Sequence, residues 1–367
     1  MAIEKVNGIE NAALPEGVQV AVTETEITPG ITEFEDGSAI IGEMQEQLDA
    51  PISIPFDANL AEHIDDGELG TIASDIVGDI ENDIQSRRDW EDQYKSGLEL
   101  LGMNYEDRAE PFEGASGIVH PLLAESVTQF QAQAYREMLP ASGPVRTHIV
   151  GAESPELLSQ AERVKNYMNY QITYEMEEYD PELDQMLFYL PIVGSAFKKV
   201  YFDPSMQRAV SKFVHAEDLI VPYNATDLRT STRIAHVIRM NKNEVRKLQL
   251  SGFYRDIDLP TSENGGTNYD EVRETISDIE GIDKGTLYNE EITLHEVHTD
   301  LDLSGFEDMD SQGEPTGLKM PYVVTIVEKS SEILSIKRNF NESDPLRRKI
   351  PYFVHYKFLP GLGFYGF

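Results

Sequence analysis

The hydrophobic pattern of this 367-residue chain changes its period near Ser195. Before that point apolar residues recur at helical spacing, as in four isoleucines placed every four residues: Ile72, Ile76, Ile80 and Ile84. After it, short runs rich in Val, Ile, Tyr and Phe are separated by Gly, Pro, Asn and Asp, which is typical of strands and turns. The sequence therefore predicts an α+β fold, with helices first and a largely antiparallel β region after them.

The same patterns predict the individual elements. Helices are predicted over residues 71–103, 122–139, 154–177 and 180–194, with shorter helices over 241–251 and 268–281. Strands are predicted over residues 145–150, 196–202, 209–215, 219–223, 233–240, 291–299, 320–329, 333–338 and 351–358. Residues 104–119 are rich in Gly, Pro and Asp and are predicted to form an extended loop.

Charge is unevenly distributed along the chain. Residues 1–86 contain 20 acidic side chains and one basic side chain, that of Lys5, with only two aromatic residues. Such a segment buries too little apolar surface to offset the entropy lost on ordering it. We therefore predict a flexible acidic arm over residues 1–65, a helical part over 66–194 and a β-rich region over 195–367. Two roles are open for the arm, a solvating tail or a contact for a basic partner.

Composition excludes several classes of function. Without cysteine, disulfides, thiolate metal sites, iron–sulfur clusters and a cysteine nucleophile are ruled out. The sequence shows no secretory signal and no run of ~18–20 apolar residues, so a soluble protein made inside the cell is expected. The net charge of −36 disfavours tight binding to nucleic-acid phosphates, though not passing contact. Short basic pairs such as Arg87-Arg88 and Lys198-Lys199 are interpreted as exposed charge.

Motifs that resemble metal sites are incomplete. His295 and His298 form the one close histidine pair, but residues three apart in a strand point to opposite faces, which disfavours a shared metal ion. Residues 300–305 (DLDLSG) begin like a calcium loop, but Ser311 stands where the bidentate Glu would be. No metal ligand is predicted.

Two glycine motifs are also incomplete. Residues 114–117 (GASG) lack the last glycine of a nucleophile elbow, and a loop rather than a strand precedes them. Residues 361–366 (GLGFYG) match a dinucleotide-binding pattern but are not followed by the helix that such a site needs. No catalytic or cofactor-binding residue is predicted.

Several blocks of the sequence resemble the portal proteins (head-to-tail connectors) of tailed bacteriophages, most closely those of certain short-tailed phages. Two of these blocks are Pro111-Phe-Glu-Gly-Ala-Ser116 and His120-Pro-Leu-Leu-Ala-Glu125. The others occupy residues 129–133, 185–199, 215–218, 221–227, 243–248, 252–256 and 355–367. The matches spread from about Trp90 to the last residue, whereas residues 1–65 carry none.

The resemblance implies a structural and mechanical role without enzymatic activity. Roughly twelve subunits would form a ring at one capsid vertex, through which the genome is packaged and later ejected. The implied partners are further copies of the chain, the terminase large subunit, capsid and scaffold proteins, tail adaptor proteins, and double-stranded DNA that passes without sequence-specific binding. No cofactor and no membrane contact are implied. The implied location is the portal vertex of the virion, after assembly in the host bacterial cytoplasm.

The resemblance also implies which part of a portal this chain represents. In that family the Gly-Phe-Tyr-Gly stretch precedes the long stem helices and the clip, so the chain corresponds to an N-terminal, wing-like part that by itself is expected to be mostly monomeric. The residues suggested as family-motif or interface positions are Trp90, Tyr94, Pro111, Phe112, Glu113, Gly114, His120, Pro121, Tyr135, Gly361, Gly363 and Gly366. For Trp90, Tyr94 and Tyr135 a contact between subunits and a place in the subunit's own core are both open, with the core favoured. Residues 111–116 form either an arm between subunits or a local turn.

Two other functions stay open from the residues alone. One is an acidic adaptor or scaffold that holds a basic partner and forms no ring. The other, less favoured, is a carboxylate-based, metal-dependent hydrolase whose ligands are hidden among the many acids. Ring formation would distinguish a portal from both, and metal-dependent thermal stabilisation would identify the hydrolase.

Overall fold

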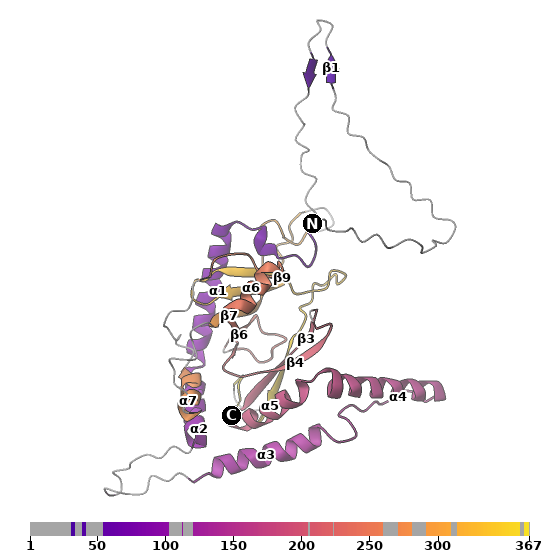
Figure 1. The fold of residues 1–367 in the computed structure, drawn as a ribbon, viewed down its shortest axis with the longest axis vertical. Coiled ribbons are helices and arrows are strands. Elements are labelled where there is room, and N and C mark those ends of the chain that lie inside the picture. Colours follow the sequence, from indigo (N-terminus) through magenta and orange to yellow (C-terminus); the bar gives the residue numbers. More distant parts are fainter. Residues whose placement is uncertain are drawn as a thin grey trace, which may run out of the picture. The chain divides into compact units, whose positions relative to one another are not determined.

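Figure 1 shows the chain as a computed structural model, which describes residues 31–33, 39–41, 54–102, 112, 120–204, 206–222, 224–259, 271–280, 291–309, 314–359 and 363–366. Contacts divide the chain into two compact units, Met1–Ile54 and Pro55–Phe367. In the first unit β1 (Ile31–Glu33) pairs antiparallel with β2 (Ala39–Ile41), two short strands that the acidic composition did not predict. The other elements belong to the second unit.

The helices of the second unit follow the predicted amphipathic segments. Within the described residues they are η1 (Leu60–Glu62), α1 (Asp66–Ser86), α2 (Arg88–Gly102), α3 (Leu122–Met138), α4 (Pro155–Tyr170), the π-helical turn η2 (Gln171–Glu175), α5 (Tyr179–Val193), α6 (Lys242–Leu250) and α7 (Glu271–Glu280). The single helix predicted over 71–103 is instead two helices that meet at Arg87. The N–H of Arg87 bonds back to the Ile84 carbonyl (3.1 Å), while its side chain is buried. None of the described helices is long and apolar enough to cross a membrane.

The main strands form two antiparallel sheets, which confirms the predicted α+β fold. The smaller sheet has the order β10–β3–β4 and is built from β3 (Ser195–Asp203), β4 (Arg208–Val214) and β10 (Phe353–Lys357). The larger sheet has the order β5–β6–β7–β8–β9 and is built from β5 (Leu219–Ile220), β6 (Arg233–Asn241), β7 (Glu291–Leu301), β8 (Met320–Val327) and β9 (Ile333–Arg338).

Residues 145–150 were predicted as a strand, but they belong to neither sheet, so this prediction is wrong. Their hydrogen bonds go to α4. The Asn169 side chain accepts a bond from the Val145 N–H (2.9 Å) and donates one to the Val145 carbonyl (3.2 Å), and the Thr147 hydroxyl donates to the Ala161 carbonyl (3.2 Å). A helix therefore supplies the partners that a neighbouring strand would have supplied.

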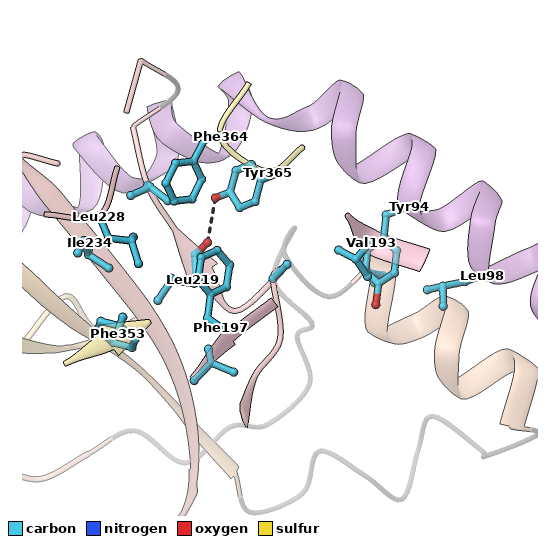
Figure 2. Close-up of a cluster of buried hydrophobic side chains, with 14 residues drawn as sticks. Tyr94, Leu98, Val193, Phe197, Leu219, Leu228, Ile234, Phe353, Phe364 and Tyr365 are labelled. Carbon is cyan, nitrogen blue, oxygen red and sulfur yellow. Dashed lines mark hydrogen bonds between the residues drawn. The ribbon is translucent and has the colours of Figure 1, made fainter. Parts of the chain in front are cut away.

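Apolar clusters join the helices to the sheets, and two of them involve the smaller sheet. The first connects α2 with both sheets and with the last described residues of the chain, as Figure 2 shows for Tyr94, Phe197, Phe353, Phe364 and Tyr365. The second fills the space between α5 and the smaller sheet and contains Leu183, Met186, Leu187, Leu190 and Ala196. Burying a large apolar side chain contributes about 1.5–3 kcal/mol, so these clusters are the main source of stability.

Polar side chains occupy an edge of each sheet. Along β9, the Asn59 side chain donates to the Leu334 carbonyl (3.0 Å) and accepts from the Ile336 N–H (3.0 Å). Along β4, the Glu182 carboxylate accepts from the Phe213 N–H (2.6 Å). These contacts cap backbone groups that would otherwise be open to another strand.

The second compact unit begins earlier than the predicted end of the acidic arm. Leu60 and Ala61 are fully buried, and the compact unit starts at Pro55, whereas the acidic arm was predicted to extend to residue 65. Burial of these apolar side chains outweighs the charge of the segment around them.

Candidate interaction surface

The segment α4 begins at the predicted start signal. The Ser154 hydroxyl accepts a hydrogen bond from the Leu157 N–H (3.2 Å), and Pro155 occupies the first helical position. The α-helix passes directly into η2, so helical structure continues to Glu175. In Figure 1, α4 reaches outward beside the smaller sheet and α5. Local sequence signals therefore account for the helix itself.

Although α4 carries large apolar side chains, none of its residues is buried. We define the α4 surface as the apolar residues of α4 and η2 that are 41–74% exposed: Leu157, Leu158, Val164, Tyr167, Met168, Tyr170 and Tyr174. A surface helix of a globular protein normally turns its apolar stripe towards the core. The α4 surface is therefore an apolar area that the described part of this chain leaves largely uncovered.

Spacing arranges the α4 surface in adjacent stripes. Leu157, Val164 and Met168 are separated by seven and four residues, which places them on one side of the helix. Tyr167, Tyr170 and Tyr174 follow at spacings of three and four, and the rings of Tyr170 and Tyr174 stack with centroids 5.7 Å apart. The result is a surface of aliphatic side chains next to aromatic ones.

Charge on α4 is balanced, in contrast to the rest of the chain. Glu156 and Glu162 are matched by Arg163 and Lys165, and Lys165 pairs with Glu162 at 2.8 Å. Two copies of a chain with net charge −36 repel each other, and this repulsion is weakest where the surface is neutral and apolar. The α4 surface is therefore suited to bind protein.

The predicted residues around α3 make contacts within the chain. Pro121 precedes the first residue of α3, and the Leu122 N–H bonds to the carbonyl of exposed His120 (2.8 Å). The Tyr135 hydroxyl donates to the Asp180 carboxylate (2.5 Å), which joins α3 to α5. The pKa of Tyr135 is raised, mainly because of this hydrogen bond to Asp180.

Tyr94 lies in the core of this chain, and the partly buried Trp90 packs against that core. Tyr94 is 2% exposed and belongs to the first apolar cluster, shown in Figure 2. The Trp90 ring stacks on Tyr365 with centroids 4.4 Å apart, and its Nε1 donates to the Val193 carbonyl (3.3 Å). Both residues therefore fix α2 to its own subunit.

The glycine-rich stretch at the end of the sequence places aromatic rings in that core. Gly363 and Gly366 have φ values of +86° and +72°, a conformation that favours glycine. The Phe364 and Tyr365 side chains between them are buried, which leaves no exposed phosphate-binding loop in these residues. Of the other predicted positions, Phe112 is 67% exposed, and Pro111, Glu113, Gly114 and Gly361 lie outside the described residues.

Two basic residues that were interpreted as exposed charge are buried. Arg87 is 4% and Lys198 is 3% exposed. Arg87 pairs with Glu91 (2.8 Å) and also donates to backbone carbonyls, while the Lys198 ammonium lies 4.1 Å from the centre of the Tyr179 ring. Burial lowers the pKa of Lys198 to about 8. The dipeptides Arg87-Arg88 and Lys198-Lys199 carry no signal that distinguishes the buried residue from its neighbour.

A buried ion pair joins the two sheets. The Lys199 ammonium of β3 lies 2.7 Å from both carboxylate oxygens of Glu296 on β7, and the His298 Nε2 lies 2.9 Å from one of them. Burial opposes ionisation of Glu296, but the Lys199 charge and the His298 hydrogen bond outweigh it and hold the pKa of Glu296 well below its usual range. Such a closed pair aligns the sheets rather than reacting with a ligand.

The described residues contain no metal centre. His295 and His298 point to opposite faces of β7, as strand alternation predicted, and His295 lies 3.9 Å from Glu328. No three His, Asp or Glu side chains of the described ranges, residues 300–305 included, gather in a position to hold an ion. Ser311 lies outside these ranges.

No protein-family model and no curated protein matches this chain. The polar side chains around Arg87 and Glu296 are bonded to other groups of the same chain, whereas the α4 surface is exposed and accessible to a partner. Sequence periodicity predicted the helix, but nothing in it indicated that the apolar side would stay exposed. The α4 surface is therefore the candidate functional site.

Proposed function

We propose that this chain is a portal subunit of a tailed bacteriophage, or the N-terminal part of one, which assembles into a ring at one capsid vertex. The ring would be the conduit for genome packaging and ejection and the docking platform for terminase and tail proteins. The sequence blocks that resemble portal proteins support this proposal. The α4 surface is the structural observation that carries it, because a subunit of a closed ring must offer apolar area to its neighbour.

The exposed area of the α4 surface is comparable to the area that one partner buries in a stable interface. Its seven side chains are each about half exposed, and with ~200 Å² for a large side chain they present roughly 700 Å². A stable interface buries about 800 Å² on each partner. At ~25 cal/mol per Å², covering this area would contribute on the order of 15 kcal/mol before the entropic costs of association.

The pairing of basic side chains with acids of the same chain supports a role in which DNA passes without being retained. Phosphate binding depends on clusters of free Lys and Arg that release counterions. In the described residues many bases are instead paired with acids of the same chain: Arg233 with Asp79 and Asp83, Arg239 with Asp218, Arg208 with Glu178, Lys199 with Glu296 and Arg255 with Asp66. An acidic surface whose bases are so occupied repels phosphates, as a conduit requires.

Negative-stain electron microscopy tests this function directly, with the protein expressed from its complete reading frame. Closed rings of about twelve subunits with a central hole are the expected result. Monomers or dimers alone, at every protein and salt concentration, would contradict the proposal. The acidic adaptor would then be the better account of the chain.

A further inference from the structure

A second exposed apolar area lies on the smaller sheet. We define the hairpin patch as Val200 and Phe202 of β3, Met206 of the β3–β4 turn and Val354 of β10, which are 42%, 60%, 55% and 45% exposed. Val200 and Phe202 share one face of the sheet because side chains alternate along a strand. Val354 pairs with Lys198 in the β10–β3 register, which places it on the same face.

The hairpin patch is the uncovered end of a face that is buried elsewhere. At the other end of β3, Ala196 lies beneath α5 in the second apolar cluster. Lys198 follows on this face, beneath the ring of Tyr179 at the start of α5. Beyond it the exposed fraction rises to 42% at Val200 and 60% at Phe202. A helix from elsewhere would extend the packing that α5 begins.

We infer that the hairpin patch receives the α4 surface of a second copy of this chain, an inference that rests on the proposed ring. Both surfaces are exposed in the same chain, so neither covers the other within one subunit. A ring contact is heterologous, which means that each subunit offers one surface to one neighbour and a different surface to the other. The two apolar areas meet that requirement.

Charge is compatible with the same pairing. Residues 195–214, which span the β3–β4 hairpin, contain four bases and one acid, and Lys212 among them is exposed. Residues 155–175, which form α4 and η2, contain three acids and two bases. Internal pairs reduce this contrast, because Lys199 bonds Glu296 and Arg208 bonds Glu178. Lys198 is also buried, so both segments present little net charge, which lowers the repulsion between two acidic copies at this contact.

The absence of cysteine allows a direct test by cross-linking. Full-length Val164→Cys and Phe202→Cys chains, carrying different affinity tags, are co-expressed and treated with a short bis-maleimide. The matched control replaces Phe202→Cys with Leu250→Cys, since Leu250 on α6 is 72% exposed but lies outside both surfaces. Each single variant should keep the wild-type melting temperature because its side chain is exposed.

The inference predicts at least about tenfold more mixed dimer for the Val164–Phe202 pair than for the control pair, because a docked contact raises the effective concentration of the two thiols. Rings that form with no excess of this mixed dimer would overturn the docking inference and leave the portal function standing. An excess of this mixed dimer in a sample without rings would support the contact between the two surfaces and contradict the proposed ring. If neither rings nor an excess of this mixed dimer is found, the docking inference and the portal function both fail.

Discussion

The Nη1 atom of Arg87 lies 3.2 Å from the phenolic oxygen of Tyr365, a residue 278 positions away in the sequence. The same guanidinium donates to the carbonyls of Glu217 (2.6 Å) and Leu219 (3.0 Å), and the Tyr365 hydroxyl donates to the Leu219 carbonyl (2.9 Å). One buried cation therefore ties the junction of α1 and α2 to the turn before β5 and to the glycine-rich stretch. Removal of either partner leaves buried polar groups without hydrogen bonds.

Replacing Arg87 should destabilise the whole body. Arg87→Ala is expected to lower the free energy of unfolding by about 3–5 kcal/mol, because it leaves several carbonyls and the Glu91 carboxylate unpaired in a buried site. Urea unfolding measures the change. Arg88→Ala is the matched control, because Arg88 is adjacent and exposed, and its effect should stay within about 0.5 kcal/mol. Equal effects of the two variants would contradict the assigned role of Arg87.

Buried histidines should make the fold less stable in mild acid. Burial lowers the pKa of His236 to about 3 and that of His295 to about 4. The unfolded chain, in which the histidine pKa is about 6.5, then binds more protons between about pH 6.5 and pH 4. The free energy of unfolding should fall through this window by up to about 1.4 kcal/mol per pH unit for each histidine.

Thermal melts of the wild type and of His236→Asn between pH 7 and pH 4.5 measure this dependence. The variant should show a shallower decrease, because one of the protonating groups is gone. His63→Asn, which replaces an exposed histidine, should retain the wild-type slope. Parallel curves for the wild type and His236→Asn would refute the prediction.

Glu217 should act in the opposite direction. Burial, with the neighbouring Asp218 charge, raises the pKa of Glu217 to about 8, whereas the unfolded carboxyl ionises near pH 4.3. The folded state therefore holds a proton that the unfolded state has lost, and this group reduces stability as the pH rises from about 4.5 to 8. Glu217→Gln keeps the shape without the ionisation. Its advantage in unfolding free energy should grow with pH, by up to about 1.4 kcal/mol per unit.

Denaturant titrations of Glu217→Gln at pH 5, 6.5 and 8 measure that advantage. Glu177→Gln provides the control, since Glu177 is exposed and the same loss of one charge should have little effect at any of these pH values. An advantage for Glu217→Gln that stays constant with pH would show that Glu217 is ionised in the folded state.

Charges on the α4 surface should block assembly and leave the subunit folded. Val164→Asp combined with Tyr174→Asp should abolish rings, because two carboxylates would have to be buried in the contact. The melting temperature of the subunit should change little, because both side chains are already exposed. Light scattering after size-exclusion chromatography gives the fraction of rings. Asn82→Asp with Gln85→Asp adds the same charge at exposed polar positions of α1, outside the α4 surface, and rings should persist.

Several parts of the fold could be predicted from local sequence. The isoleucines of α1 and the Ser154-Pro155 start of α4 were sufficient because helical hydrogen bonds and caps join residues only a few positions apart. Residues 145–150 were misassigned because the group that bonds Val145, the Asn169 amide, lies 24 residues away on a helix. The break at Arg87 was missed for the same reason, since most groups that bond its buried side chain, from the Ala216 carbonyl to the Tyr365 hydroxyl, lie 129 to 278 positions away.

The sequence by itself determined most of the helices and strands, the α+β class and the absence of cysteine chemistry, because periodicity and composition can be read from short segments of the chain. Only the tertiary structure decided that Arg87 is buried while Arg88 is exposed, and that Trp90 and Tyr94 meet the glycine-rich stretch. It also decided that the apolar side of α4 stays uncovered. Burial depends on which distant segments come together. The sequence of one helix does not indicate whether its own chain or another chain covers its apolar side.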